Sequence, residues 1–547
     1  MVVIKVDKKR LENLTGLLIN DLEEIFETLA VDIKRGDDLS WDLELYPDRP
    51  DLYSIFGLSR AIRQYKFQEE RNYKVKKSNI FLKVDKNVSS IRPFIGAAII
   101  RDLYLNDTTI RDIMDLQEKL HLTVGRDRKK IAIGIHDLDK VKPPFKYAAY
   151  LPEEISFIPL GFQKKMNLME IIKNHPKGIE YAELLKDFKM YPVITDSENN
   201  VLSFPPIING TLTQVTEKTK NIFIDVTGLD LFTVINTLDL TVTALNELSM
   251  ENESVNINYP EGMMVLPDLK YEKLPIEKTE IENMLGIKMD EESIFKALKS
   301  MGYKYSMKKK KIEVGIPPYR IDIMHPVDII EDVAKAYGFN KIEKSLPEKF
   351  SIGIESNVEM VKERLRRIMI GLGYIETINL TFTSPERNFF IFNLDKEESM
   401  NIVNPVIEDQ SIYRTWLIPM LMETLKNNKH RNLPQKIFEI GEVFDGKETI
   451  HIAGVSISSN ASFTEIKGVV GKFLQSLGLE MNIKEDKKPF LINGRQASII
   501  INDQYVGFFG EMHPEIIERF DLGNPVVVFE LNIERIFSDI FKDRLEF

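Results

Sequence analysis

Cysteine is absent from this sequence of 547 residues, and tryptophan occurs only twice. The lack of cysteine excludes disulfides, thiolate zinc sites, iron–sulfur clusters and cysteine nucleophiles. The seven histidines are scattered singly without a His-x-x-x-His pair, so a zinc enzyme is not expected either. The motifs GxxxxGK[ST], GxGxxG, GxSxG and HExxH are also missing. A search for short motifs therefore identifies no enzyme class.

Long apolar runs and an excess of positive charge are missing as well. No stretch approaches the roughly 18–20 apolar residues that span a bilayer, and the opening MVVIKVDKKRLENL lacks the apolar segment of a signal peptide. We therefore expect a cytoplasmic protein without a membrane partner. The formal net charge of −11 argues against an autonomous, strongly electrostatic nucleic-acid binder, but it does not exclude local basic patches.

The composition is that of a large folded protein. Hydrophobic residues make up 43% and charged residues 29% of the chain, and the length predicts about three to four domains. Strand and helix patterns mix throughout, so we expect an α+β multidomain fold. A charged stretch at 70–79 is interpreted as a linker, and the alternating segment 496–512 as one long strand. The expected regions are an N-terminal α/β module (1–87), an α+β domain (88–264), a winged-helix-like helical domain (265–346) and a mainly antiparallel sheet flanked by helices (347–547).

An acidic quartet in PPYRIDIMHPVDIIEDVAKAYGF is the most localised chemical signal. Asp322 precedes a predicted helix, and Asp328, Glu331 and Asp332 share one face of that helix at positions i, i+3 and i+4. Four oxygen donors without nitrogen or sulfur suit Mg²⁺ rather than zinc. Acidic first turns are common because they favour the positive end of the helix dipole. The spacing alone therefore leaves helix capping as the simpler explanation.

Basic clusters and single histidines are given ordinary interpretations. The clusters are Lys308–Lys311 and the group Arg126, Arg128, Lys129 and Lys130. Either cluster has the charge to contact RNA phosphate, but charge runs at turns need no partner, so we interpret both as solvated. His136 and His513 are interpreted as structural or surface residues rather than catalytic ones.

Eight segments spread along the chain carry a recognisable signature. In chain order they are YPDRPDLYSIFGLSRAI, GRDRKKIAIGIHDLD, VLSFPPIING, PPYRIDIMHPVDIIEDVAKAYGF, NIVNPVIEDQSIYRTWLIPML, KIFEIGEVF, FTEIKGVVGKFL and FFGEMHPE. Together they resemble the beta subunits of phenylalanyl-tRNA synthetases, in the shorter form found in archaea and eukaryotes. They cover nearly the whole chain in the order of that family.

The resemblance implies a class II synthetase of two alpha and two beta subunits. It attaches phenylalanine to tRNA(Phe) at the expense of ATP with Mg²⁺, and no DNA partner is expected. The catalytic site belongs to the alpha subunit, so residues 347–547 should keep a class II synthetase-like fold without catalytic motifs. In agreement, Arg414 lacks a glutamate two residues on, and no GxGxER occurs in the last 200 residues.

Two further expectations come from the same resemblance. Family members place Mg²⁺-binding carboxylates, shared with the alpha subunit, at the spacing of Asp322, Asp328, Glu331 and Asp332. The resemblance thus favours a metal site where spacing alone did not. The chain is too short for the extra tRNA-binding and anticodon-binding modules of bacterial members, so anticodon recognition by this subunit is not expected.

Residues 88–264 resemble the family's editing domain, which hydrolyses Tyr-tRNA(Phe). A pocket made for phenylalanine rejects an added hydroxyl only about a hundredfold, whereas a pocket with a buried acceptor prefers tyrosine. Asp225 and Thr227 lie one strand period apart in FIDVTG. We predict that Asp225 recognises the tyrosine hydroxyl, while Thr227, Ser203 and Asn209 hold the ester or its attacking water. A turn network around Asp225 and Thr227 is the alternative.

Two other functions stay open at this point. One is a free-standing aminoacyl-tRNA deacylase that uses residues 88–264 without an alpha subunit. The other is a non-enzymatic RNA- or DNA-binding scaffold, suggested by the winged-helix-like region, although fold alone licenses no function. A large exposed apolar surface on the 347–547 core would favour a synthetase subunit, because only that function needs a large partner interface.

Overall fold

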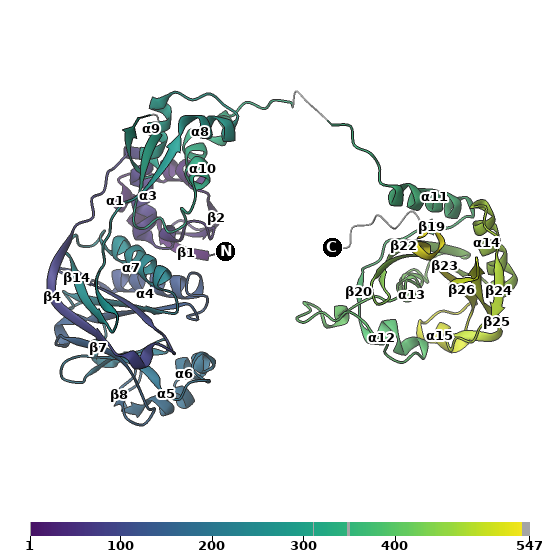
Figure 1. Cartoon of the computed structure of the whole chain (residues 1–547), viewed down its shortest axis with the longest axis horizontal. Helices are drawn as coiled ribbons and strands as arrows, with labels where there is room; N and C mark the ends of the chain where they lie inside the picture. Colours follow the sequence, from purple (N-terminus) through teal and green to yellow (C-terminus); the bar gives the residue numbers. More distant parts are fainter. Residues whose placement is uncertain (1, 310, 347–350, 539–547) are drawn as a thin grey trace. The chain divides into compact units, whose positions relative to one another are not determined.

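Two compact units make up the chain, residues 1–346 and residues 347–547 (Figure 1). The computed structural model describes residues 2–309, 311–346 and 351–538. Both units combine helices with sheets, which confirms the expected mixed multidomain class. Across these described ranges, no helix combines the length and the apolar character needed to cross a bilayer.

The first region of unit one is a small sheet with three helices packed beside it. The strands pair in the order β1–β3–β2, and both pairs are antiparallel. The arrangement is therefore α+β rather than the expected α/β. Its elements are β1 (Val2–Asp7), α1 (Lys8–Thr15), α2 (Ile19–Thr28), β2 (Val31–Gly36), β3 (Ser40–Leu45) and α3 (Ile55–Phe67).

A ten-stranded sheet follows, in the order β12–β11–β10–β7–β4–β14–β5–β13–β6 with β15 paired to β14. β4 begins at Val75 and pairs with β7 and β14. Half of the expected linker at 70–79 is therefore a strand of this sheet. The sheet thus begins before residue 87, where the N-terminal module was expected to end. The strands are β4 (Val75–Val84), β5 (Phe94–Ile100), β6 (Ile131–Asp137), β7 (Phe145–Tyr150), β10 (Tyr191–Thr195), β11 (Val201–Phe204), β12 (Ile208–Asn209), β13 (Ile222–Gly228), β14 (Asn252–Tyr259) and β15 (Gly262–Leu266).

Two helices pack against this sheet. α7 contacts β5 and β13, and α4 contacts β6. A separate two-stranded pair, β8 with β9, precedes two short helices. The bounds are α4 (Asp107–Leu122), β8 (Ser156–Phe157), β9 (Met166–Asn167), α5 (Leu168–Asn174), α6 (Pro176–Tyr181) and α7 (Leu231–Leu245).

The last region of unit one combines a three-stranded sheet, β16–β18–β17, with three helices. At the turn of its hairpin, Lys308 and Lys311 form ion pairs with Glu313 and Glu277, and Lys310 lies outside the described residues. The elements are β16 (Glu272–Glu277), α8 (Lys278–Leu285), α9 (Glu291–Ser300), β17 (Lys304–Lys308), β18 (Lys311–Ile316) and α10 (Pro326–Tyr337).

A network of buried charges connects the regions of unit one. Arg49 and Arg60 contact the buried carboxylate of Asp51 at 2.8 and 3.4 Å. Arg60 also donates to the carbonyl oxygen of Thr243 on α7, at 3.3 Å. Its guanidinium lies 3.7 Å from the ring centre of Tyr319, which belongs to the last region. Buried charges are stable only when paired, so these contacts fix the three regions relative to one another.

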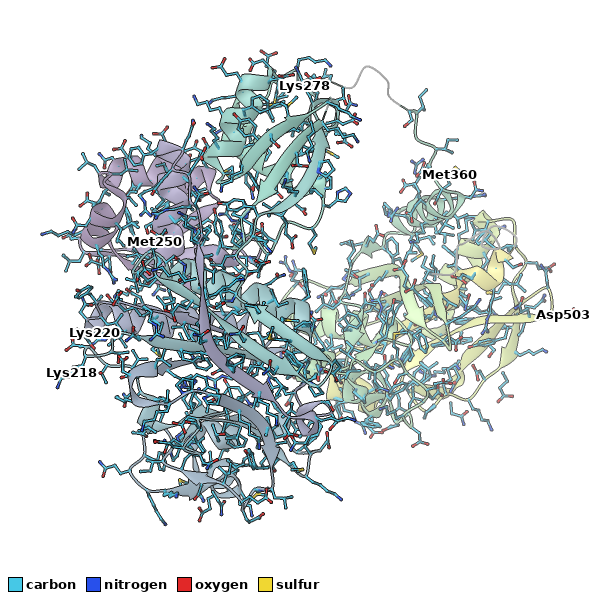
Figure 2. The ribbon with its side chains drawn as sticks, turned by 60° about the vertical axis from the view of Figure 1, so that its left-hand side comes forward. Lys218, Lys220, Met250, Lys278, Met360 and Asp503 are labelled. Carbon is cyan, nitrogen blue, oxygen red and sulfur yellow. The ribbon has the colours of Figure 1, made fainter. Side chains whose placement is uncertain are left out.

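Unit two is built on a seven-stranded sheet, β19–β22–β23–β27–β26–β25–β24, in which β19–β22 is parallel and the other pairs are antiparallel. The predicted long strand 496–512 is wrong, because it is a hairpin. Asn502 and Asp503 adopt positive φ angles of 49° and 62°, which suit a two-residue turn. Asp503 is labelled in Figure 2.

The bounds in unit two are α11 (Asn357–Gly371), β19 (Ile375–Glu376), β20 (Phe382–Thr383), α12 (Pro385–Asn388), β21 (Ile412–Tyr413), α13 (Ile418–Asn427), β22 (Gln435–Phe444), β23 (Glu448–Ile457), α14 (Phe463–Ser476), β24 (Asn482–Glu485), β25 (Leu491–Ile501), β26 (Gln504–Met512), α15 (Pro514–Arg519), β27 (Val526–Asn532) and α16 (Ile533–Ile536).

The buried network predicts how unit one responds to mutation. Asp51→Asn leaves two buried guanidinium groups without their counterion, so the free energy of unfolding of unit one should fall by about 3 kcal/mol. Urea unfolding of a Trp416→Phe chain measures this, since Trp41 then reports on unit one alone. Asp48→Asn is the matched control, because Asp48 belongs to an exposed pair with Lys335 and its loss should cost less than about 1 kcal/mol. Equal stability of the two variants would contradict the account.

The same carboxyl predicts a dependence on pH. Burial alone raises the pKa of Asp51, but Arg49 and Arg60 outweigh it and lower that pKa from 3.8 to about 2. A folded-state pKa below the unfolded value gives stability above pH 4, which is lost as the pH falls from about 4 to about 2. The loss should amount to about 2 kcal/mol and should be absent in Asp51→Asn.

Candidate functional site

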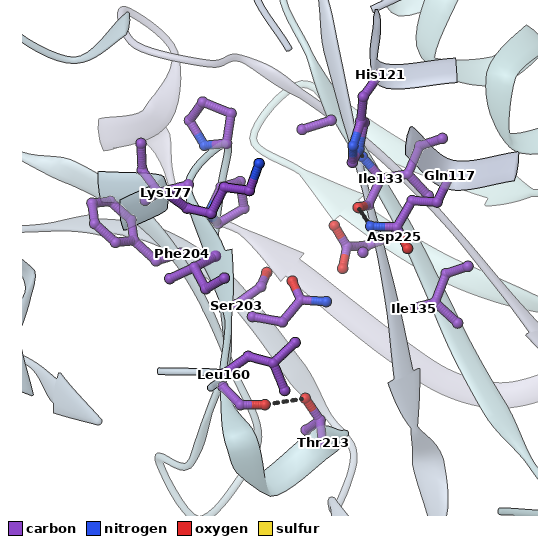
Figure 3. A pocket seen from close by; sticks show the side chains of 18 of the residues that line it. Gln117, His121, Ile133, Ile135, Leu160, Lys177, Ser203, Phe204, Thr213 and Asp225 are labelled. Carbon is purple, nitrogen blue, oxygen red and sulfur yellow. Dashed lines mark hydrogen bonds between the residues drawn. The ribbon is translucent and has the colours of Figure 1, made fainter. Parts of the chain in front are cut away.

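A pocket of about 350 Å³ lies in unit one, between α4 and the strands β6, β11, β12 and β13 (Figure 3). This volume falls within the range of small-molecule sites. Three of the predicted editing residues line it, namely Asp225, Ser203 and Asn209. Thr227 is not among the lining residues. Its Oγ1 accepts a hydrogen bond from Arg92 Nε at 3.0 Å instead.

Asp225 is placed by a glycine on the neighbouring strand. The carboxylate is 1% exposed, and Asp225 lies opposite Gly134 in the β13–β6 pairing. A Cβ atom at Gly134 would lie 2.3 Å from Asp225 Oδ1, so only glycine leaves room for the carboxylate. His136 Nε2 donates to Oδ1 at 2.8 Å, and its Nδ1 lies 2.8 Å from Thr213 Oγ1. His136 is thus a buried residue that holds Asp225.

Two polar side-chain atoms at the pocket have no protein partner among the described residues. They are Ser203 Oγ and Gln117 Oε1, and both are buried. Buried polar atoms are normally hydrogen-bonded, so these atoms point to a ligand or an ordered water. The sequence reasoning missed Gln117. Its signal is a stripe at helical spacing on α4, Ile110, Met114, Gln117 and His121, all of which line the pocket.

Arg128 fixes the loop that closes one side of the pocket. Its Nη1 donates to the carbonyl oxygen of Ile207 at 2.9 Å, and its Nη2 contacts Glu118 on α4 at 2.8 Å. The side chain is buried, so its interpretation as a solvated charge is wrong. Burial alone raises the pKa of Glu118, but contacts with His121 and Arg128 outweigh burial and lower that pKa to about 2. Burial also lowers the pKa of His121, whose Nε2 accepts the N–H of Ile133.

The acidic quartet of the last region is arranged differently from a metal site. Arg320 contacts Asp322 at 2.7 Å and Asp332 at 2.6 Å, and Glu331 pairs with Lys335. Within the part of the chain that the structure describes, no group of three or more acidic or histidine side chains is placed to hold a metal ion. The quartet by itself therefore does not fit Mg²⁺.

Asp328 acts as a helix cap in this arrangement. Its Oδ2 accepts the backbone N–H groups of Met324 and His325, both at 2.8 Å. These bonds complete a capping box at the start of α10.

The capping role predicts the effect of removing this carboxylate. Asp328→Ala should lower the stability of unit one by about 1 kcal/mol, because backbone donors at the start of α10 lose their acceptor. The loss should be equal in excess Mg²⁺ and in EDTA when urea unfolding of Trp416→Phe chains is followed through Trp41. Stabilisation of the wild-type chain by Mg²⁺ that Asp328→Ala abolishes would contradict this assignment.

In unit two, the one arginine of the predicted class II signature is already paired. Arg414 is buried and contacts Glu439 at 2.6 Å, while its Nε donates to the carbonyl oxygen of Glu442 at 2.9 Å. A Cβ atom at Gly441 would lie 2.3 Å from Arg414 Nη2, so the glycine makes room for this pair. A separate cavity of about 620 Å³ is lined by Thr415 and Trp416, but Arg414 is not part of its wall.

Comparison with known proteins places these features in one family. Three family models match, described as B3/4 domain (residues 77–243), tRNA synthetase B5 domain (274–339) and phenylalanyl tRNA synthetase beta chain CLM domain (342–533). The phenylalanine–tRNA ligase beta subunit of Methanosarcina barkeri is 42% identical, over 98% of this chain and 100% of its own. That of Archaeoglobus fulgidus is 36% identical, over 98% and 99%.

A solved structure agrees with these sequence matches. The crystal structure of an N-terminal fragment of the phenylalanyl-tRNA synthetase beta subunit from Pyrococcus horikoshii is 38% identical to this chain, with a TM-score of 0.59. It covers 61% of this chain and 99% of the fragment. The resemblance seen in the sequence is thereby confirmed, and the chain belongs to the phenylalanine–tRNA ligase beta subunit family, a component of an aminoacyl-tRNA ligase.

Proposed function

We propose that the chain works in the cytoplasm with an alpha subunit in ATP-dependent attachment of phenylalanine to tRNA(Phe), and that it hydrolyses Tyr-tRNA(Phe) in the pocket of unit one. The editing domain in this proposal spans residues 88–264 together with β4. The supporting observation is a buried carboxylate, Asp225, in the wall of a pocket with two orphan polar atoms. A free-standing deacylase would share this pocket, so the alpha subunit needs separate support.

Selection for tyrosine follows from the state of Asp225. His136 uses Oδ1, and no hydrogen bond to Oδ2 is present among the described residues. A tyrosine hydroxyl donates to this second oxygen. A phenylalanine ring leaves this second oxygen without a partner in a buried site, which costs about 1–3 kcal/mol or more for a charged group. Sites built to bind a hydroxyl therefore discriminate strongly against substrates that lack it.

The other pocket residues face the ester rather than the ring in this proposal. Ser203 and Asn209 lie opposite each other in the β11–β12 pairing, and the hydroxyl of Ser203 has no protein partner among the described residues. They are suited to hold the ester carbonyl or the attacking water. Attack by water on the ester yields free tyrosine and a tRNA with its terminal hydroxyl restored. Thr227 does not line the pocket, and Arg92 donates to both its hydroxyl and its carbonyl oxygen, so this proposal does not place it at the ester.

Substitution of Asp225 tests the editing proposal. Asp225→Asn keeps the size of the side chain but removes the charged acceptor, so hydrolysis of Tyr-tRNA(Phe) should slow about ten- to a hundredfold, in line with the loss of a charge-assisted bond. Charging with phenylalanine by the complete enzyme should be unchanged.

The matched control is Asp239→Asn. Asp239 is another buried carboxyl of unit one, outside the pocket wall, and burial raises its pKa to about 8. Asparagine therefore resembles its neutral form, and the deacylation rate should not change. A normal rate for Asp225→Asn would remove Asp225 from the site.

The sequestration of Arg414 supports a non-catalytic core. A class II site needs an arginine free to contact ATP, whereas here the guanidinium is buried against Glu439 and a backbone carbonyl. We therefore assign ATP chemistry to the alpha subunit. The acidic quartet does not hold Mg²⁺ alone, so an ion near Asp328 and Glu331 requires additional donors from the alpha subunit, and no step of the editing proposal depends on it.

Exposed apolar residues between positions 370 and 407 of unit two support the alpha subunit as partner. Met360 on α11 precedes these residues in the sequence and is itself exposed (Figure 2). Large exposed apolar surfaces mark protein interfaces, and neither a free deacylase nor a simple scaffold needs this one. The exposed residues are Ile370, Ile375, Ile378, Leu380, Phe382, Phe390, Met400, Val403, Val406 and Ile407.

Charges on this surface should disrupt assembly. Val403 is 89% exposed, so the double variant Val403→Asp/Val406→Asp should leave unit two folded but abolish co-purification with the alpha subunit, because binding would bury two unpaired charges. Ile354→Asp is the control, since Ile354 is 96% exposed but precedes α11. Mass measurement of the co-expressed assembly gives the result. An intact assembly from the double variant would refute this interface.

A further inference from the structure

The basic side chains of the editing pocket differ in whether a ligand can reach them. Among the described residues that line it, Lys177, Arg128 and His121 are the basic or imidazole groups. Arg128 is buried and bound to backbone carbonyls and Glu118. His121 is buried as well, and burial lowers its pKa. Within this described wall, the charge of Lys177 is the one that a ligand can reach.

Lys177 is held by an exchangeable partner. Its ammonium contacts Glu180 at 2.9 Å, and both side chains are partly exposed. Such surface pairs contribute little, at most about 1 kcal/mol, so an anion can take the place of Glu180 at low cost. The ammonium also lies 5.4 Å from the ring centre of Tyr181.

The backbone beneath Lys177 is fixed on both sides. His175 Nδ1 accepts the N–H of Lys177 at 3.1 Å, and its Nε2 donates to the carbonyl oxygen of Leu160 in the pocket wall, also at 3.1 Å. Gly178 packs against α5 so closely that a Cβ atom would lie 1.9 Å from the carbonyl oxygen of Ile171. Lys177 is therefore a flexible side chain on a rigid base.

The two charged side chains lie on opposite walls. Figure 3 shows Lys177 reaching into the pocket from one side and Asp225 from the other. An aminoacyl-tRNA in this pocket has its tyrosine side chain at Asp225. The ester, the terminal nucleoside and then the first phosphodiester follow along the chain of the substrate. That phosphodiester is an anion, and a cation across the pocket from Asp225 complements it.

We propose that Lys177 is a positioning residue for editing: its ammonium contacts the phosphodiester next to the terminal nucleoside of the mischarged tRNA. The inference rests on the proposed editing function and adds the group that recognises the nucleic-acid part of the substrate. Lys177 takes no part in the chemical step, so its loss should affect binding rather than turnover.

The test compares two substrates, Tyr-tRNA(Phe) and 3′-O-tyrosyl-adenosine, which has no phosphate. Lys177→Ala should raise KM for Tyr-tRNA(Phe) about tenfold, the size of one charge-assisted contact, with kcat unchanged. Hydrolysis of the adenosine ester should be unaffected, and Lys177→Arg should restore most of the loss. The slope of log(kcat/KM) against log salt should fall in magnitude by about 0.7, as expected for one phosphate contact on a single strand.

Lys186→Ala is the matched control. Lys186 pairs with Glu183 three residues before it, is exposed, and does not line the pocket. Its removal should change neither KM nor the salt slope. An unchanged KM in Lys177→Ala, or equal slowing of both substrates, would overturn the inference. If the wild-type chain hydrolyses neither substrate, the editing function fails and the inference fails with it. If Asp225→Asn loses hydrolysis of Tyr-tRNA(Phe) while Lys177→Ala keeps the wild-type KM, only the inference on Lys177 is overturned and the editing function stands.

Discussion

A local cluster of buried charges organises unit one through the contacts that one arginine makes with distant segments. Asp51 pairs with Arg49 and Arg60 in a buried site, and Arg60 continues to the carbonyl oxygen of Thr243 on α7. α7 packs against β13, the strand that carries Asp225. The position of Asp225 is therefore coupled through one helix to charges more than 150 residues earlier in the chain. Arg60 also stacks on the ring of Tyr319, so its contacts with Thr243 and Tyr319, rather than the ion pairs themselves, limit how far the regions can move apart.

The same electrostatic rule separates two kinds of carboxylate in unit one. Asp332 and Asp322 are neutralised by Arg320 within the chain, so they need no metal ion. Within the described ranges, no lysine or arginine forms an ion pair with Asp225. Its hydrogen-bond partner is His136, and its second oxygen is left for a ligand in the part of the chain that the structure describes. The pocket thus combines a fixed acceptor on one wall with a movable cation, Lys177, on the other.

The sequence predicted much of this arrangement because its signals are local. Alternating apolar strands and helix-capping glycines gave most elements, and the family resemblance indicated Asp225, Ser203 and Asn209. Thr227 shares a strand face with Asp225, but two residues advance about 7 Å along a strand, and this step takes Thr227 to Arg92. The single strand predicted over 496–512 is instead part of the hairpin β25–β26, because Asn502 and Asp503 interrupt the alternation only briefly.

Other features depend on contacts that no local pattern reveals. The spacing of the acidic quartet placed three carboxylates on one helix, but it gave no information on the guanidinium of Arg320 between two of them. Arg128 belongs to a basic run, yet it is buried by contacts with Ile207, almost 80 residues away. The need for glycine at position 134 also arises across two strands rather than along one.

The central claim is that a hydroxyl donor on the substrate ring, and not ring size, selects the ester for hydrolysis. Single-turnover hydrolysis of Tyr-tRNA(Phe) and of the same tRNA carrying 4-fluorophenylalanine separates the two, because fluorine is small but donates no hydrogen bond. The account predicts that the wild-type enzyme hydrolyses the tyrosyl ester at least about a hundredfold faster, as expected for a site built to bind a hydroxyl. Similar rates for the two esters would contradict it.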